Sequence, residues 1–353
     1  MREYVKNMST NKFIIGPKME KNGIFAGNKF PRDIISIFEK NHYTPVYIRE
    51  GYVKKRPWEF LNDVYQLIRL PRNSIVFYID RVHPNLSRNL VYSILRRKNI
   101  KSFSILEDID PLRDKKMSTN DRKLGLESLN SNKGIISQNK KMTRFLVNQG
   151  VRVTTVELSA LDFLVSNYKE KKHKKSADTI IVYGGNLSSE QAGFLNHLPI
   201  SKSNNKIKYR VYGMGEMSKQ LSSNAIYCGG FSAEESIDKL KGDWGLVWNN
   251  DGSKSNKSGQ NSYYEYVCPH KLSMYAICGM PIIVGKKSAM ADFVINNKCG
   301  IVINNLEEIE KKINAISQQE YLEYQKNISK IASKMALGFY TQNAIRKIEK
   351  KIL

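Results

Sequence analysis

A chain of 353 residues, 41% hydrophobic and 10% aromatic, has enough apolar material for two folded domains and is not generally disordered. Its 57 lysines and arginines against 33 acidic residues give a formal net charge of +24, which suits nucleic acid, an anionic membrane or phosphate-bearing substrates, or simply reflects a lysine-rich surface. We expect no nucleic-acid partner, because the sequence has neither a Cys/His finger nor an aromatic RNA-binding strand.

Strand and helix patterns alternate through the first half of the chain. The alternation begins with a strand at 12–16 and a helix at 30–41, whose apolar residues recur at helical spacing. It continues with strands at 44–48, 74–79 and 101–106, helices at 57–70 and 89–99, and a strand, helix, glycine turn and strand over 133–158. This order predicts a doubly wound parallel sheet.

A basic polar run without apolar periodicity, residues 167–178, predicts a domain boundary. Beyond it the alternation restarts at residue 179, and the last thirty residues read as helix. The sequence therefore predicts an α/β architecture of two Rossmann-like domains that face each other across a cleft. We place the first domain at 1–166, the basic linker at 167–178, the second domain at 179–335 and a C-terminal helix at 336–353.

The four cysteines form no CxxC pair, which argues against a zinc site or a disulfide framework and fits a reducing compartment. The N-terminus lacks the apolar core of a signal peptide, and no window approaches ~18 uninterrupted apolar residues. We therefore expect a cytoplasmic protein. Its basic C-terminal helix leaves open a contact with the inner face of a membrane.

The stretch "EYVCPHKLSMYAICGMPIIVG", residues 265–285, predicts a helix with Pro269 in its first turn and Gly279 as its stop before a strand. Lys271 then lies in the first helical turn, where free N–H groups already favour an anion. A lysine at this end of the helix dipole suits a bound diphosphate, or it is an ordinary solvated side chain. Tyr266 and His270 lie in the same stretch and are further candidates for the same site.

Two glycine turns follow strands of the second domain. "VYGGNLSS" contains Gly185, Asn186, Ser188 and Ser189, and a turn of this type lets the backbone approach a phosphate or sugar. "YCGGF" ends in Phe231, which stacks on a base or belongs to the core. The strand "WGLVW" runs into a polar loop where Asn250 and Asp251 are candidates to bind sugar hydroxyls.

Carboxylates follow a strand of the first domain in "ILEDIDPL". Glu107 and Asp108 are candidates for a general base, because they follow the carboxyl end of the strand. The alternative is a helix N-cap formed by Asp108 or Asp110. The "DID" triplet lacks the context of a metal-binding DxD motif, so we expect no metal.

The segments "GGFSAEES", "GDWGLVWNNDG" and the block at 264–294 resemble, in order and spacing, a bacterial GT-B glycosyltransferase family. The family comprises glucosyltransferase-3-like enzymes, which extend glycans on serine-rich-repeat adhesins, and related beta-1,6-galactofuranosyltransferases of polysaccharide assembly. The resemblance is strongest over 179–303 and extends through "ILEDIDPL" and "SQNKKMTRFLVNQGV" in the first half.

This resemblance implies a metal-independent enzyme without a cofactor that binds a UDP-sugar through its C-terminal domain. Lys271 matches the lysine that contacts the diphosphate, Phe231 an aromatic of the nucleotide pocket, and 185–189 a donor-binding loop. Some members carry an arginine in that loop where this chain has Ser188 and Ser189, which leaves the donor sugar open. Asn22 and Gly23 match a first-domain loop that faces donor and acceptor.

We therefore predict a glycosyltransferase that moves a hexose, such as glucose or galactofuranose, from a UDP-sugar to a glycan on a protein or lipid carrier. The alternative is a non-catalytic homologue that binds a glycan or a partner protein. Peripheral membrane contact and homo-oligomer formation remain open at this point.

Overall fold

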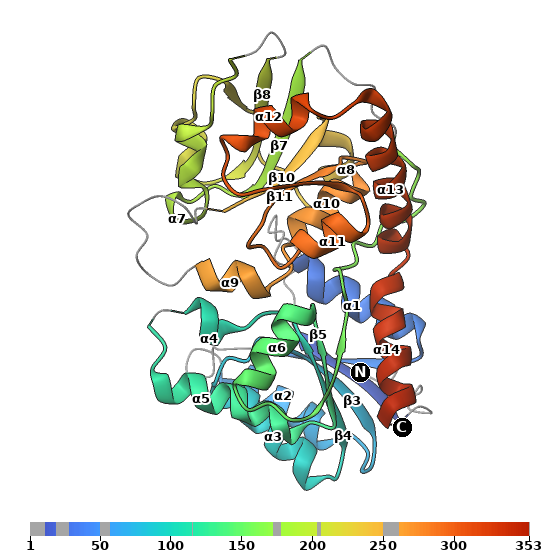
Figure 1. The fold of residues 1–353 in the computed structure, drawn as a ribbon. Helices are drawn as coiled ribbons and strands as arrows, with labels where there is room; N and C mark the ends of the chain where they lie inside the picture. The colour runs from blue at the N-terminus through green and yellow to red at the C-terminus, as the bar shows by residue number, and fades with distance from the viewer. Residues whose placement is uncertain are drawn as a thin grey trace. The chain divides into compact units, whose positions relative to one another are not determined.

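The computed structural model describes residues 11–18, 28–49, 57–114, 116–171, 178–202, 206–249 and 261–352. The chain divides into two compact units, which are described separately below. The first comprises Met1–Gly23, Phe30–Ser159 and Tyr340–Leu353, and the second comprises Ile24–Lys29 and Ala160–Phe339. Each contains one six-stranded parallel sheet with helices against it (Figure 1).

The first sheet has the strand order β2-β1-β3-β4-β5-β6. Its strands are β1 (Lys12–Pro17), β2 (Thr44–Ile48), β3 (Ile75–Asp80), β4 (Lys101–Leu106), β5 (Gly134–Ser137) and β6 (Thr154–Glu157). The connecting helices are α1 (Lys29–Lys40), α2 (Pro57–Ile68), α3 (Leu86–Arg97), α4 (Asp110–Arg113), α5 (Thr119–Glu127), η3 (Ser128–Ser131) and α6 (Lys140–Asn148). The central strands β1, β3 and β4 are buried along nearly their whole length, because helices cover a parallel sheet on both faces.

Side chains that cap helices explain where several of these helices begin. The side chain of Asn85 accepts a hydrogen bond from the backbone of Arg88 at the start of α3, and Asn139 accepts one from Met142 at the start of α6. Each cap satisfies a backbone N–H that has no partner within the helix.

The last helix, α14 (Phe339–Ile352), packs on the first sheet. Its residues Ala344, Ile345 and Ile348 are buried. Gly134 of β5 lies so close to Ile348 that a Cβ on this glycine would come within 3.0 Å of it. At the other side of the helix, Glu349 accepts hydrogen bonds from Lys12 Nζ and from the Tyr43 hydroxyl, both at 2.8 Å.

The second sheet has the strand order β12-β11-β10-β7-β8-β9. Its strands are β7 (Thr179–Asn186), β8 (Ile207–Met214), β9 (Ala225–Tyr227), β10 (Trp244–Val247), β11 (Ile282–Gly285) and β12 (Gly300–Ile303). Its helices are α7 (Ser189–Ala192), η4 (Gly193–His197), η5 (Glu216–Lys219), α8 (Ser236–Lys239), α9 (Asn261–Tyr266), α10 (His270–Ile277), α11 (Ala291–Asn296), α12 (Glu308–Asn314) and α13 (Gln318–Ala336).

The order of the second sheet reverses between β7 and β10, where the chain crosses from one half of the sheet to the other. Ligands of such sheets bind outside the carboxyl ends of the strands at this switch point. Together the two parallel sheets and the C-terminal helix confirm the predicted fold class. No helix within the described ranges is long and apolar enough to cross a bilayer.

Candidate functional site

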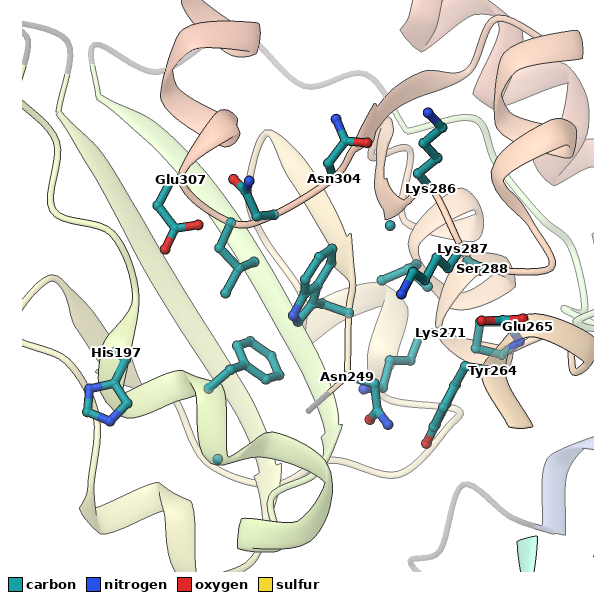
Figure 2. Close-up of a pocket in the computed structure, with 18 of the residues that line it drawn as sticks. His197, Asn249, Tyr264, Glu265, Lys271, Lys286, Lys287, Ser288, Asn304 and Glu307 are labelled. Atoms are coloured by element: carbon teal, nitrogen blue, oxygen red, sulfur yellow. The ribbon is translucent and has the colours of Figure 1, made fainter. Parts of the chain in front are cut away.

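A cavity of about 730 Å³ lies in the second unit, outside the carboxyl ends of β10, β11 and β12 (Figure 2). The short helix η4, which follows β7 and α7, closes another part of its wall. The cavity therefore lies beside the switch point between β7 and β10, at the half of the sheet formed by β10, β11 and β12. Its lining residues are Gly193, Phe194, Asn196, His197, Val247, Trp248, Asn249, Tyr264, Glu265, Pro269, Lys271, Gly285, Lys286, Lys287, Ser288, Asn304, Asn305, Leu306 and Glu307.

Lys271 is the second residue of α10, whose first turn has no side-chain cap from Pro269. Its ammonium donates a hydrogen bond to the Tyr183 hydroxyl at 2.7 Å and lies 3.9 Å from the centre of that ring. The lysine stem passes over Gly185 at the end of β7, where a Cβ would come within 2.7 Å of Lys271 Cε. The positive φ of 153° at Gly185 favours glycine at this position, and a side chain there would also displace the lysine.

Tyr275 fixes α10 against the sheet and so determines where Lys271 points. Its ring covers Gly245 of β10, where a Cβ would come within 2.3 Å of the ring. Its hydroxyl accepts a hydrogen bond from the backbone of Gly184 at 2.8 Å and lies 3.3 Å from the carbonyl oxygen of Leu246. One buried side chain thus joins the helix to both strands at the switch point.

The charge of Lys271 is poorly compensated. Burial lowers the pKa of Lys271 to about 7. Within the described ranges, no carboxylate forms an ion pair with this ammonium, and its hydrogen-bond partner is a neutral phenol. Burying a cation without an anion is unfavourable, so an anion bound at this point would stabilise the protonated lysine. The adjacent N–H groups at the start of α10 favour an anion for the same reason.

Three aromatic side chains and two more lysines complete the cavity. Trp248 packs over Gly285 and lines the cavity together with Phe194 and Tyr264. Lys286 and Lys287 are exposed at the carboxyl end of β11. The sequence analysis missed these residues, although "VGKKS" directly follows a strand of the parallel sheet, as ligand-binding loops do.

The predicted donor-binding turn at the end of β7 does not itself form the cavity wall; the helix η4 further along the chain does. Asn186 accepts a hydrogen bond from the backbone of Ser188 at 2.9 Å, and the backbone of Ser189 donates one to Glu216 at 2.7 Å. These three residues do not line the cavity, whereas η4, which follows α7, does. The turn thus positions η4, and Gly185 faces Lys271 directly.

Phe231 lies against the glycine next to Gly185. A Cβ on Gly184 would come within 3.3 Å of the Phe231 ring, which packs edge-on against Tyr212 with centroids 6.1 Å apart. Phe231 is half-buried and is not part of the cavity wall. Lys271 and Phe231 therefore approach two consecutive residues of β7.

Tyr266 and His270 flank the cavity without lining it; the residues beside them, Glu265, Pro269 and Lys271, do. Burial, and secondarily the nearby Lys29, lower the pKa of His270 to about 4, so this imidazole is neutral at physiological pH.

Four predicted site residues, Asn22, Gly23, Asn250 and Asp251, lie outside the described residues. Asn249, directly before the latter pair, lines the cavity.

In the first unit, Glu107 and Asp108 follow β4 as expected. Asp108 is buried, accepts a hydrogen bond from the backbone of Ile109 at 2.8 Å and pairs with Arg113 at 3.1 Å. The alternative of a helix cap by Asp108 or Asp110 is wrong: Ile109 occupies the cap of α4 without a side-chain hydrogen bond, and Asp110 is already helical.

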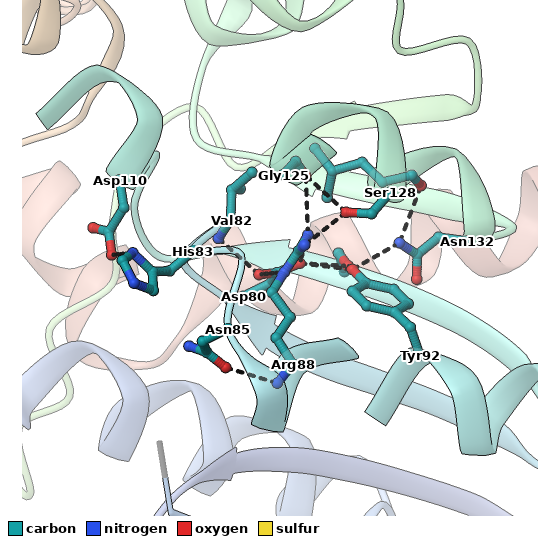
Figure 3. Close-up of polar contacts among 12 residues, drawn as sticks. Asp80, Val82, His83, Asn85, Arg88, Tyr92, Asp110, Gly125, Ser128 and Asn132 are labelled. Carbon is teal, nitrogen blue, oxygen red and sulfur yellow. Dashed lines mark hydrogen bonds and ion pairs between the residues drawn. The ribbon is translucent and has the colours of Figure 1, made fainter. Parts of the chain in front are cut away.

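A histidine that the sequence analysis did not single out lies beside these carboxylates (Figure 3). His83 follows β3, the neighbour of β4 in the sheet, and its Nδ1 lies 3.3 Å from Asp110 Oδ2. Nδ1 is buried while 42% of the side chain is exposed, so the exposed edge is the one that carries Nε2. Val82, just before it, has a positive φ of 60°, a strained conformation for a β-branched residue and one that is common near functional sites.

Asp80, the last residue of β3 and three residues before His83, forms a buried ion pair with Arg88 (Figure 3). Arg88 donates to both oxygens of Asp80, at 2.8 and 2.9 Å, and also to Ser128 at 2.6 Å. The hydroxyl of Tyr92 donates to Asp80 at 2.6 Å and accepts from Asn132 at 3.1 Å. Burial opposes both charges, yet Asp80 holds the pKa of Arg88 above its ordinary value and Arg88 holds that of Asp80 below.

Comparison with known proteins identifies related sequences for both units. Residues 12–160 match the family model of the glucosyltransferase 3-like N-terminal domain, and residues 181–348 match that of the C-terminal domain. Over 216 residues the chain is 24% identical to the beta-1,6-galactofuranosyltransferase WbbI of Escherichia coli K12, covering 61% of this chain and 62% of that protein.

A second relative and a solved structure extend the comparison. Over 131 residues the chain is 27% identical to glucosyltransferase 3 of Streptococcus gordonii, covering 37% of this chain and 38% of that one. Each of these two matches spans less than two thirds of the relative. Anabaena HepE, solved with UDP and glucose, superimposes with a TM-score of 0.62 over 96% of this chain and 100% of its own, at 11% identity. At that identity the similarity shows a shared fold.

Proposed function

The chain belongs to the glucosyltransferase 3-like family and has the GT-B fold, and from this premise we propose that it transfers a hexosyl group from a UDP-sugar to a carbohydrate acceptor. The second unit binds the donor and the first unit binds the acceptor. The relatives named above, a galactofuranosyltransferase and a glucosyltransferase, support galactofuranose or glucose as the transferred sugar.

One observation carries the proposal: Lys271 is a partly buried cation without a carboxylate partner among the described residues, at a helix start beside the switch point. A diphosphate would accept hydrogen bonds from this ammonium and from the first N–H groups of α10. As the glycosidic bond breaks, negative charge grows on the leaving UDP, and a fixed cation stabilises that charge. Among the candidate donor residues, Gly185 gives the lysine its path, and Phe231 is the candidate to contact the base.

The test is UDP binding by titration calorimetry. We expect Lys271→Ala to weaken UDP binding by about 10- to 100-fold, the range of a hydrogen bond to a charged group. Lys326→Ala removes an exposed lysine on α13 and serves as the control with unchanged affinity. Equal dissociation constants for both variants would rule out the diphosphate role, and absence of UDP release with every UDP-hexose would instead favour a non-catalytic homologue.

If the reaction inverts the anomeric centre, the first unit supplies the base that takes the proton of the acceptor hydroxyl. Glu107 and Asp108 remain the predicted candidates, and the structure adds His83, whose Nδ1 faces Asp110 while Nε2 is open to solvent. We expect one of Glu107→Gln, Asp108→Asn or His83→Asn to lower kcat about 10²- to 10⁴-fold without changing UDP affinity. Near-wild-type rates for all three variants would show that none of these residues of the first unit is the base.

The remaining assignments are part of the same proposal. The acceptor is a glycan on a protein or a lipid carrier, and the reaction takes place in the cytoplasm, where UDP-sugars are made. Sedimentation velocity of the purified chain tests whether it forms the homo-oligomer that the sequence leaves open.

A further inference from the structure

Helix α2 presents four large apolar side chains to solvent. Trp58 is 81% exposed, Leu61 55%, Tyr65 57% and Ile68 55%. Their spacing of three, four and three residues places them in one stripe along the helix. These four residues are called the outer face of α2.

The outer face is separate from the side of α2 that packs on the domain. Leu67 is buried and Phe60 and Val64 are partly buried, and these three form a second apolar stripe that faces inward. The helix contacts β2 and α3. A surface helix normally has one apolar stripe, so the second stripe indicates that something other than water covers it.

The surroundings of the outer face are basic. Lys98 at the end of α3 donates a hydrogen bond to the carbonyl of Ile68 at 2.8 Å, which brings the ends of α2 and α3 together. The Arg69 guanidinium stacks on the Tyr65 ring at 5.4 Å. The basic residues at these two helix ends are Arg69, Arg72, Arg96, Arg97 and Lys98.

No exposed carboxylate among the described residues of 57–101 offsets this charge. Asp63 and Asp80 are buried, and Glu59 is paired with Arg49. A second copy of the chain would bring the same arginines and lysines against this face, so like charges would oppose such a contact. An anionic surface would attract them.

We propose that the outer face of α2 docks on an anionic lipid membrane, with its apolar side chains among the acyl chains and its basic neighbours at the headgroups. Tryptophan and tyrosine favour this interface, and basic residues near it interact with anionic lipid. The inference is independent of the transferase reaction. It also moves the membrane contact away from α14, whose apolar residues Ala344, Ile345 and Ile348 are buried within the first unit.

Sedimentation of the full-length protein with phosphatidylcholine vesicles, with and without about one third phosphatidylglycerol, tests the proposal. We expect binding to the anionic vesicles and weak binding to the neutral ones. Leu61→Asp should reduce the partition coefficient on the order of tenfold or more, because it places a charge in the apolar layer. Asn62→Asp adds the same charge at the next, exposed position of the helix and is the matched control.

Arg72→Gln should reduce binding to the anionic vesicles about fivefold and leave neutral vesicles unaffected. Trp58 gives the readout: it is 81% exposed on the outer face, whereas Trp244 is 2% exposed and Trp248 lies in the cavity wall of the second unit, not on α2. Brominated lipid should quench part of the wild-type fluorescence, and Trp58→Phe should lose that quenching.

Three results would overturn the proposal. The first is no binding to anionic vesicles. The second is equal binding of Leu61→Asp and Asn62→Asp. The third is a dimer in solution that Leu61→Asp dissociates, because the outer face would then be an interface between copies of the chain.

Discussion

The two sheets each place a cation near their carboxyl ends, Arg88 fully buried and Lys271 partly buried, and the two cations differ in what surrounds them. Arg88 in the first unit is matched by Asp80, Tyr92 and Ser128, and its pKa stays above the ordinary value although burial opposes the charge. Lys271 in the second unit has a phenol as its partner, and burial lowers its pKa to about 7. Removing one partner of a matched pair leaves a buried charge without compensation, whereas the lysine has no carboxylate partner among the described residues and is the cation that we propose binds an anionic ligand.

The largest effect should come from breaking the satisfied pair. Arg88→Met leaves Asp80 buried without its cation and should lower the free energy of unfolding by roughly 3–5 kcal/mol, as for other broken buried ion pairs. Urea denaturation measures it, with Arg96→Met at an exposed position of the same helix as the control. A loss below about 1 kcal/mol would mean that the network does not stabilise the first unit.

An intermediate effect is expected at Gly185. Gly185→Ala forces a side chain onto the lysine stem and strains a positive φ of 153°, which should lower the free energy of unfolding by roughly 1–3 kcal/mol and weaken UDP binding. Gly150→Ala is the matched control, because Gly150 also has a positive φ, of 85°, but nothing lies within 4 Å of its Cβ position. Unchanged UDP affinity in Gly185→Ala would show that the lysine tolerates another path.

The smallest effect on stability should come from the unsatisfied cation itself. Lys271→Met keeps the apolar stem and removes a charge that the fold does not compensate. The free energy of unfolding at pH 6 should therefore stay level or rise by about 1 kcal/mol. A loss as large as that of Arg88→Met would mean that the ammonium is structural, and the contrast between the two cations would fail.

The difference in the free energy of unfolding between wild type and Lys271→Met should depend on pH with a defined sign. Because the pKa of Lys271 is about 7 in the folded chain and its ordinary value is 10.5, the folded chain binds fewer protons than the unfolded chain between those values. Stability therefore rises with pH in this window through Lys271, and the penalty is full below pH 7. Urea denaturation from pH 6 to 9.5 should show the free energy of unfolding of wild type rising relative to that of Lys271→Met. If the two free energies change in parallel with pH, the lowered pKa is contradicted.

The sequence predicted the fold because each strand is a short apolar run and each helix carries its own apolar spacing. The position of Lys271 in the first helical turn was predictable because Pro269 and the apolar spacing define the start of the helix locally and Gly279 defines its end. Lys286 and Trp248 were missed because they reach the same cavity only through the pairing of β10 with β11, which no local pattern specifies. His83 was missed for the same reason, since only the pairing of β3 with β4 brings it to Asp110.

The packing of α14 on the first sheet also has a consequence for synthesis of the chain. The first unit is the first to leave the ribosome, yet the helix that supplies Ile348 and Glu349 to it is translated last. Until then the surface around Gly134 and Lys12 lacks its cover, so the first unit cannot complete its packing before the end of the chain is made. A nascent chain stalled shortly before residue 340 should therefore be more sensitive to protease in its first unit than the released protein.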